Sequence, residues 1–212
     1  MGDITTFYVN SLRECTYVFS STGRECIIVD PGCQNDRERA RIDDFIAERS
    51  LSPVCIFLTH AHFDHVLSLA WFARKWNIPA VLGAGDVELL GKLQSYTKMF
   101  GMEYLPTDDV EFRYVSDGDE ISYAGFNFRV MATPGHTPGC VCYIEEREKL
   151  MFSGDTLFQG SIGSTDFEEG CEEDMYVSLA KIRKLDPGIT VYPGHGYPTT
   201  IAEELRTNPY LR

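Results

Sequence analysis

Three of the five histidines in this 212-residue chain lie close together in the stretch His60-Ala61-His62-Phe63-Asp64-His65. The apolar run Val54–Leu58 precedes the stretch and indicates a buried strand. His60 and His62 are two residues apart, so on extended backbone their side chains point the same way. Asp64 and His65 follow where the chain is expected to turn into a helix, which brings them to the same region. Imidazole and carboxylate groups packed this closely suit divalent metals, so the stretch predicts a metal site.

The other two histidines and a further aspartate each follow a segment that is expected to be a strand. These pairs are His136 after Phe126–Ala132, Asp155 after Leu150–Ser153, and His195 after Thr190–Tyr192. Small residues and turns separate each strand from its polar residue. Because a rigid sheet presents the ends of its strands at one edge, we expect these side chains to converge there.

The predicted site has seven candidate ligands, more than one tetrahedral zinc ion accepts. They are His60, His62, Asp64, His65, His136, Asp155 and His195. This number suits two divalent ions held close together, with one carboxylate and one hydroxide bridging them. Asp155 is the natural bridge, because it is the only carboxylate at its own strand end. Zinc is the expected metal, and a mixed histidine and aspartate site also accepts iron or manganese.

Composition restricts the class of protein. A chain of this length with 43% hydrophobic residues can bury a substantial core, and residues 1–212 are expected to form one domain. The net charge of −13 argues against nucleic-acid or membrane partners, which favour basic patches. No apolar run is long enough to span a bilayer or to act as a leader. The seven cysteines are scattered without a CxxC pair, which favours reduced thiols and a cytoplasmic location.

The order of the expected elements favours helices packed outside a sandwich of sheets, an α+β architecture. Runs of β-branched and aromatic residues predict strands in the N-terminal third and again between residues 110 and 153. Apolar residues at helical spacing predict four longer helices and a short one at the C-terminus. The longer helices are expected over Asn35–Arg49, His65–Trp76, Asp86–Phe100 and Glu172–Leu185.

The motif His60-x-His62-x-Asp64-His65, followed in order by His136, Asp155 and His195, resembles the metallo-β-lactamase superfamily. The resemblance covers essentially the whole chain, including the Asp-Pro-Gly turn at residues 30–32. It implies a four-layer αββα sandwich, the metallo-β-lactamase fold, with a dinuclear site at the edge of the two sheets. Residues 133–139 and 153–158 are similar to the glyoxalase II branch, and residues 160–167 and 208–212 to its short bacterial members.

This resemblance also implies which residues hold which ion. The first ion would be held by His60, His62 and His136. The second would be held by Asp64, His65 and His195, with Asp155 bridging and with Asp64 and Asp155 as catalytic carboxylates. The implied reaction is hydrolysis of a small thioester of the S-lactoylglutathione type, in which the bridging hydroxide attacks the carbonyl and the thiolate leaves.

The sequence departs from the glyoxalase II pattern in three places. The chain ends soon after His195, so no C-terminal helical domain is expected to supply basic contacts to glutathione. Ser164 stands where short relatives usually have arginine, and Val66-Leu67-Ser68 replaces a smaller, glycine-containing step. These departures concern the substrate and leave the predicted ligand set complete.

Other functions remain open on the sequence. A persulfide dioxygenase would resemble this fold but use a single iron, held by His60, His136 and Asp155. A lactonase or another ester hydrolase would use the same metal chemistry. A module that binds metal without turnover would also keep the site, and the sequence leaves the oligomeric state unknown.

Several further residues have two interpretations. Asp30 and Thr59 either orient metal ligands or serve as a turn residue and a helix cap. The aromatic residues Phe158, Phe167 and Tyr197 are expected to pack in the core rather than line a substrate pocket. The acidic segment around Glu168-Glu169 is expected to be a solvated loop.

Overall fold

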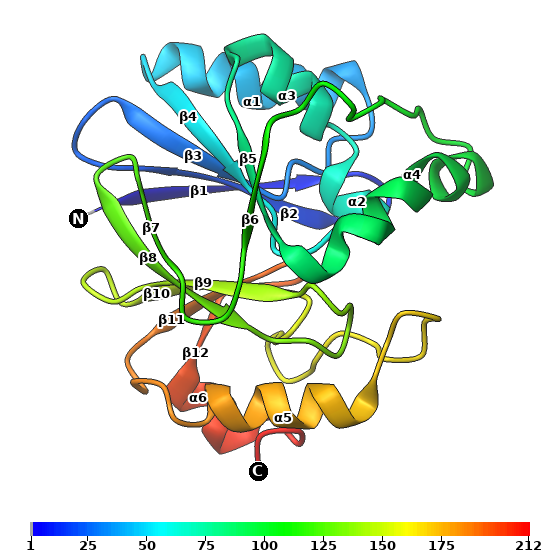
Figure 1. Cartoon of the computed structure of the whole chain (residues 1–212). Helices are drawn as coiled ribbons and strands as arrows, with labels where there is room; N and C mark the ends of the chain where they lie inside the picture. Colours follow the sequence, from blue (N-terminus) through cyan, green and yellow to red (C-terminus); the bar gives the residue numbers. More distant parts are fainter. Residues whose placement is uncertain (1) are drawn as a thin grey trace.

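The structure, a computed structural model, describes residues 2–212. Two six-stranded sheets face each other, and helices cover the outer face of each sheet (Figure 1). The expected α+β architecture with four αββα layers is therefore confirmed.

The first sheet contains the N-terminal strands in chain order. They are β1 (Asp3–Val9), β2 (Glu14–Ser20), β3 (Glu25–Val29), β4 (Ser52–Phe57), β5 (Ala80–Gly83) and β6 (Phe112–Val115). The strands β1 to β3 pair antiparallel, and β3 to β6 pair parallel. Strand β4 lies inside the sheet, which agrees with the unbroken apolar run that predicted it.

The second sheet runs in the order β12-β11-β10-β9-β8-β7. Its strands are β7 (Glu120–Tyr123), β8 (Phe126–Ala132), β9 (Val141–Glu145), β10 (Leu150–Gly154), β11 (Thr190–Pro193) and β12 (Thr199–Thr200). Strand β9 is antiparallel to both β8 and β10, and β10 is parallel to β11. The strands β8, β10 and β11 therefore run in one direction and end at the same edge. The two-residue strand β12 is an element that the sequence pattern did not predict.

The helices are distributed over the two outer faces and one end of the sandwich. They are α1 (Asp36–Glu48), α2 (Phe63–Val66), α3 (Leu69–Trp76), α4 (Val87–Met99), α5 (Glu172–Ile182) and α6 (Ile201–Thr207), with a 3-10 turn η1 at Ala84–Asp86. In Figure 1, α1 and α3 lie over the first sheet, α5 and α6 lie over the second, and α2 and α4 lie at one end. Side-chain caps begin two of them, since Asn35 accepts from the Glu38 amide and Thr200 from the Glu203 amide.

Three apolar clusters separate the four layers, and the alternation along β3 shows how the sequence builds them. Cys26 and Ile28 belong to the cluster between the first sheet and its helices. Ile27 and Val29 belong to the cluster between the two sheets. A third cluster packs the second sheet against α5 and α6. Because side chains alternate across a strand, one apolar run fills two layers of core.

Hydrogen bonds join the two sheets close to the histidine cluster. The Tyr143 hydroxyl of β9 donates to the carbonyl of Leu58 at 2.8 Å, and the Val141 amide donates to the carbonyl of Thr59 at 2.9 Å. The Cys15 amide of β2 donates to the carbonyl of Gly194 at 2.8 Å. These bonds fix the ends of the strands from both sheets against each other.

The single helix expected over His65–Trp76 is wrong, because the structure divides it into α2 and α3. The Ser68 amide donates to the carbonyl of Pro31 at 2.9 Å instead of to the carbonyl four residues before it. That carbonyl, of Asp64, accepts from the Asn10 side chain at 3.0 Å. Two partners distant in sequence thus replace one helical hydrogen bond, and the helix is interrupted at that point.

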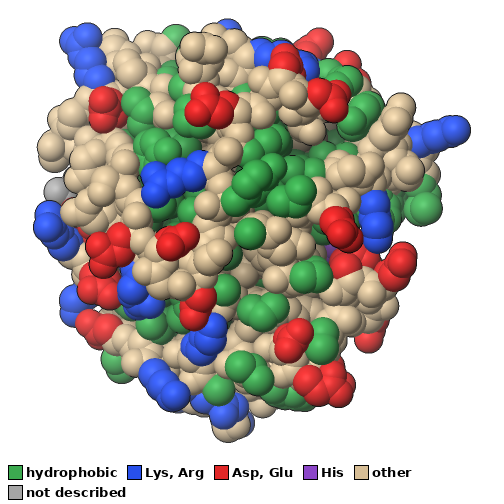
Figure 2. Space-filling view, in the orientation of Figure 1, with side chains coloured by type: hydrophobic (Ala, Val, Ile, Leu, Met, Phe, Trp, Pro, Cys, Tyr) green, Lys and Arg blue, Asp and Glu red, His purple; other side chains and the backbone are tan. Residues whose placement is uncertain are grey.

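Acidic and basic side chains are both present on the surface. On the face shown in Figure 2, basic side chains are interspersed with acidic ones and histidine is nearly absent. Among residues 2–212, no helix has the length and apolar character that crossing a bilayer requires.

Candidate metal centre

All seven predicted ligands converge at the edge where β4, β8, β10 and β11 end. Six of the seven side chains form two groups of three, and the ligand atoms within each group lie within 4.8 Å of one another. One group is His60, His62 and His136, and the other is Asp64, His65 and His195. A third group, His60, His65 and Asp155, overlaps both.

Asp155 lies between the two groups of ligands. Its Oδ1 atom is 3.4 Å from His65 Nε2. Its Oδ2 atom is 3.4 Å from His136 Nε2 and 3.7 Å from His195 Nε2. One carboxylate therefore faces nitrogens of both groups, which is the position that a bridging ligand needs.

The donor atoms at this point fit metal ions. His60 Nε2, His65 Nε2 and Asp155 Oδ1 are buried and have no hydrogen-bond partner among residues 2–212. Leaving buried polar atoms without partners costs free energy, and native structures rarely do so. A set of imidazole nitrogens and carboxylate oxygens is the donor chemistry that zinc, iron and manganese accept, so divalent ions would satisfy all three atoms.

The outer nitrogen of each ring is turned toward an oxygen, which fixes the ring orientation. The pairs are His60 Nδ1 with Thr59 Oγ1 at 3.1 Å, His65 Nδ1 with Asp30 Oδ2 at 3.1 Å, His136 Nδ1 with the Ser164 carbonyl at 2.6 Å, and His195 Nδ1 with the Leu12 carbonyl at 3.2 Å. Each of these rings thus directs its Nε2 atom into the centre.

The contacts of Asp30 and Thr59 fit the interpretation in which they orient metal ligands. Asp30 accepts from the Thr59 amide at 2.7 Å and from the Thr59 hydroxyl at 2.6 Å, and it also contacts His65. Its backbone has a φ of 47°, which is strained for a residue with a side chain. The turn at the end of β3 therefore holds a carboxylate behind His65 and, through the Thr59 hydroxyl, behind His60.

Burial and the charges within the cluster shift the pKa values of its members in opposite directions. Burial, together with neighbouring histidines, holds the pKa of His60 well below its ordinary value and lowers that of His62 to about 4. Burial also acts to lower the pKa of His65, but Asp64 and Asp155 outweigh it and raise this pKa well above its ordinary value. Burial acts to raise the pKa of Asp155, but His65 and His136 hold it well below the ordinary range. Asp155 is therefore an anion at neutral pH, available to a cation.

Two glycines make room for this carboxylate. Gly154 has a φ of 49°, a conformation that favours glycine, and a Cβ atom there would collide with the Thr59 side chain. A Cβ atom on Gly194 would collide with Asp155 Oδ1 and crowd His65. The glycines that precede Asp155 and His195 are thus required for the close approach of these two strand ends.

Two buried carboxylates near the ligands were missed by the sequence analysis. Glu14, the first residue of β2, is fully buried, and its Oε1 atom lies 3.8 Å from His65 Nδ1. Burial raises its pKa well above the ordinary value. Its one signal in the sequence was a charged residue adjoining an apolar strand.

Asp86, at the end of η1, joins two of the ligand loops. It accepts from the Ala61 amide at 2.8 Å, the Thr137 hydroxyl at 2.8 Å and the Gly139 amide at 2.7 Å. In the sequence its position indicated only the start of a helix. Like the ligands themselves, it follows a strand end through small residues, and that signal could have identified it.

Expectations for the surrounding loop residues need correction. Phe167 and Tyr197 are 53% and 63% exposed, so the expectation that they pack in the core is wrong. The Phe167 ring centroid lies 5.4 Å from that of His62. Glu169, expected in a solvated loop, has a side chain only 11% exposed and lies 3.6 Å from His62 Nε2. The pattern of the sequence alone did not distinguish it from its exposed neighbour Glu168.

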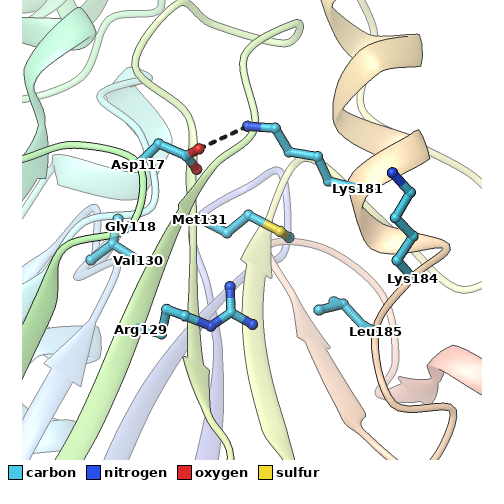
Figure 3. A pocket seen from close by; sticks show the side chains of 8 residues that line it. All are labelled: Asp117, Gly118, Arg129, Val130, Met131, Lys181, Lys184 and Leu185. Carbon is cyan, nitrogen blue, oxygen red and sulfur yellow. Dashed lines mark hydrogen bonds and ion pairs between the residues drawn. The ribbon is translucent and has the colours of Figure 1, made fainter.

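The site opens to solvent at His62 and His195, whose side chains are 15% and 26% exposed. A separate hollow of about 410 Å³ lies between β8 and the end of α5, and none of its lining residues is a candidate ligand. In Figure 3 the Lys181 ammonium points to Asp117 across that hollow, and it also donates to the carbonyl of Ala132 at 2.9 Å. We place the chemistry at the histidine cluster, because none of the residues that line this hollow belongs to a group that could hold a metal ion.

Comparison with known proteins agrees with this geometry. The chain is 36% identical over 193 residues to the probable metallo-hydrolase YqgX of Bacillus subtilis, covering 88% of this chain and 87% of the relative. It is 32% identical over 211 residues to the hydroxyacylglutathione hydrolase GloC of Haemophilus influenzae, covering 98% and 95% of the two chains.

Solved structures give the same result. The B3 metallo-beta-lactamase BLEG-1 superposes with a TM-score of 0.89 at 32% identity, over 99% of each chain. TTHA1623 in a di-iron-bound form superposes with a TM-score of 0.85 at 31% identity, over 98% of this chain and 100% of the other. The family model of the metallo-beta-lactamase superfamily matches residues 13–195, which include every candidate ligand. The fold is therefore the metallo-β-lactamase fold, and the chain belongs to the metallo-beta-lactamase superfamily, with glyoxalase II-like relatives.

Proposed function

We propose that this protein is a dinuclear metal-dependent hydrolase of a small thioester. His60, His62 and His136 would hold the first ion, and Asp64, His65 and His195 the second, with Asp155 between them. The observation that carries the proposal is the presence of buried, unpartnered donor atoms on three of these side chains at one point. Zinc is the metal we expect. Iron is the alternative, because the related structure of TTHA1623 is in a di-iron-bound form.

Two divalent ions, when bound, lower the pKa of a shared water so that hydroxide is available near neutral pH, and they polarise the carbonyl to be attacked. The residues of the chain hold that chemistry in place. Asp155 keeps its negative charge because the surrounding imidazoles lower its pKa. Asp64 Oδ2 lies 3.3 Å from His195 Nε2, which orients both groups on the solvent-facing side. We propose Asp64 and Asp155 as the catalytic carboxylates, since both would contact the metal ions.

The thioester class is supported by the relative named as a hydroxyacylglutathione hydrolase, which this chain matches over almost its whole length. A substrate would enter where His62 and His195 reach solvent. The exposed rings of Phe167 and Tyr197 are available to contact its apolar parts. A complete second group at Asp64, His65 and His195 favours this function over a dioxygenase that needs three ligands for one iron.

We also propose a small-molecule partner and a cytoplasmic location. The seven cysteines are unpaired, and six of them are buried, as suits a reducing compartment. The net charge of −13 is unsuited to nucleic acid, which needs basic contacts to phosphates.

The test is steady-state hydrolysis of S-lactoylglutathione by protein stripped of metal and by the same protein reloaded with zinc, iron or manganese. We expect no hydrolysis without metal, recovery on reloading, and a rate near background for Asp155→Asn. The exposed variant Glu168→Gln is the matched control and should keep the wild-type rate. Reloaded wild-type protein that hydrolyses no thioester would reject the substrate class. One iron per chain with oxygen consumption on a persulfide would instead support the dioxygenase.

A further inference from the structure

The loop of residues 164–169, between β10 and α5, contacts two candidate ligands of the first ion. The Ser164 carbonyl accepts from His136 Nδ1 at 2.6 Å. The Phe167 ring packs edge-on against His62 and His136, with centroids 5.4 and 5.7 Å apart. Glu169 Oε1 lies 3.6 Å from His62 Nε2.

His62 differs from the other histidines in the nitrogen that it directs into the centre. Its Nδ1 atom faces His136 Nε2 at 2.8 Å, so Nδ1 is the atom placed to bind metal. Its Nε2 atom points outward to Glu169, which is the only carboxylate within 4.0 Å of that atom in the described part of the chain. A neutral imidazole carries its proton on one nitrogen, and the partner of that nitrogen decides which one.

The carboxylate of Glu169 is held in place from the other half of the molecule. The Tyr96 hydroxyl of α4 donates to Glu169 Oε1 at 3.2 Å. The Glu169 side chain is 11% exposed, whereas that of the adjacent Glu168 is 84% exposed. Two glutamates that follow each other in sequence therefore have different environments, and only one of them faces the site.

We propose that Glu169 is a positioning residue for the first ion: its carboxylate keeps the proton of His62 on Nε2 and so presents the Nδ1 lone pair to the metal. This inference rests on the proposed dinuclear function. A carboxylate behind a ligating imidazole fixes the ring orientation and raises ligand basicity, and loss of such a partner typically lowers metal affinity roughly 10–100-fold. Because Ser164 orients His136 in the same way, one loop sets two of the three ligands of the first ion.

The experiment measures metal retained per chain against free zinc buffered by a chelator, in the full-length protein. Glu169→Ala should weaken one of the two bound ions by roughly 10–100-fold and leave the other at its wild-type affinity. Tyr96→Phe should weaken the same ion by a smaller factor, because the carboxylate is less firmly held. The matched control Glu168→Ala removes an equal charge from the same loop and should change neither ion. Glu169→Gln keeps an acceptor without the charge and should fall between wild type and Glu169→Ala.

A second readout separates positioning from a general loss of structure. In zinc-loaded wild-type protein, the histidine region of a long-range proton–nitrogen NMR spectrum should show a slowly exchanging Nε2 proton on His62. This resonance should be lost in Glu169→Ala, while the thermal midpoint of the metal-free variant stays at the wild-type value. Equal weakening of both ions, or an unchanged spectrum and affinity, would overturn the inference.

The outcomes also separate this inference from the proposed function. Wild-type protein that binds two ions but hydrolyses no thioester contradicts the proposed function. The inference about Glu169 is then still tested by the metal affinity of Glu169→Ala. Wild-type protein that binds no ion at His62 overturns both. Wild-type protein that hydrolyses the thioester while Glu169→Ala holds both ions at wild-type affinity overturns the inference alone.

Discussion

The position of Asp155 depends on the neighbouring residues Gly154 and Gly194 as well as on strand β10. Gly154 and Gly194 carry no side chain where one would strike Thr59 or the Asp155 carboxylate. The sequence analysis identified Asp155 from its position after a strand, but the neighbouring glycines looked like ordinary turn residues. Their function became visible only when the ends of β10 and β11 were placed side by side.

Substitution of Gly194 tests this packing. We expect Gly194→Ala to displace Asp155 and to weaken metal binding by roughly 10-fold or more, the effect typical of disturbing the surroundings of a metal ligand. The measurement is metal retained per chain after dialysis against a weak chelator. Gly91→Ala in α4 is the matched control, because nothing lies within 4 Å of the added Cβ atom. Equal metal retention by both variants would contradict the account of Gly194.

The shifted pKa values predict how metal binding depends on pH. In the metal-free protein His65 and His195 have raised pKa values, because nearby carboxylates outweigh the effect of burial. Each carries a proton below its pKa, and a metal ion must displace that proton. Metal affinity should therefore rise with pH and fall as the pH decreases. His60 and His62, whose pKa values are lowered, should release no proton near neutral pH.

Calorimetric titration of zinc at pH 7 in buffers of different ionisation enthalpy measures the protons released. We expect net proton release at pH 7, because zinc displaces the protons of His65 and His195. Zinc uptake without proton release at pH 7 would show that His65 and His195 are already neutral.

The types of the strands and helices followed from sequence periodicity, because the spacing of apolar side chains reflects which face of an element is buried. The alternating pattern of β8 correctly predicted a strand with one buried face, and the unbroken apolar run of β4 correctly predicted a strand buried on both faces. The interruption between α2 and α3 could not be predicted in this way. It depends on the carbonyl of Pro31 and the side chain of Asn10, which reach Ser68 and Asp64 from other parts of the chain.

Substitution of Ser68 tests how much its side chain stabilises the fold at this interruption. Its hydroxyl donates to the Cys33 carbonyl at 2.6 Å and accepts from Arg39 Nε at 2.8 Å, and the residue is fully buried. Ser68→Ala leaves a buried carbonyl and a buried guanidinium without this partner, so we expect a loss of about 1–3 kcal/mol in the free energy of unfolding. Urea unfolding of the metal-free protein measures it. Ser95→Ala, on the exposed side of α4, should have an effect within about 0.5 kcal/mol.

Across the molecule, the sequence was most informative where a residue type is rare and its spacing is fixed. The positions of the five histidines, together with Asp64 and Asp155, were sufficient to predict the edge of the sandwich that carries the candidate ligands. Acidic residues are common in this chain, so Glu14, Asp86 and Glu169 could not be distinguished from surface carboxylates by type alone. Only the packing of β2, η1 and the loop before α5 shows that Glu14 and Glu169 lie beside candidate ligands and that Asp86 joins the ligand loops.

The layered core also predicts the reactivity of the cysteines. Six of the seven are buried, and burial raises the thiol pKa of Cys15, Cys26 and Cys55 to about 12. Since the thiolate is the reactive form, we expect a disulfide reagent at pH 8 to modify one thiol in the native protein, that of Cys171. Cys171→Ser should abolish this rapid phase, and denaturation should expose the remaining six. Several fast-reacting thiols in folded Cys171→Ser protein would contradict the burial of the other six cysteines in the layered core.

The central claim is that one edge of the sandwich holds two metal ions between the ligands supplied by four strand ends. Metal content per chain tests it most directly, measured by elemental analysis of protein loaded with zinc and freed of excess metal. We predict a value near two for wild type and near one for His195→Ala, which removes a ligand from the second ion only. A wild-type value near one, unchanged by His195→Ala, would contradict the dinuclear account.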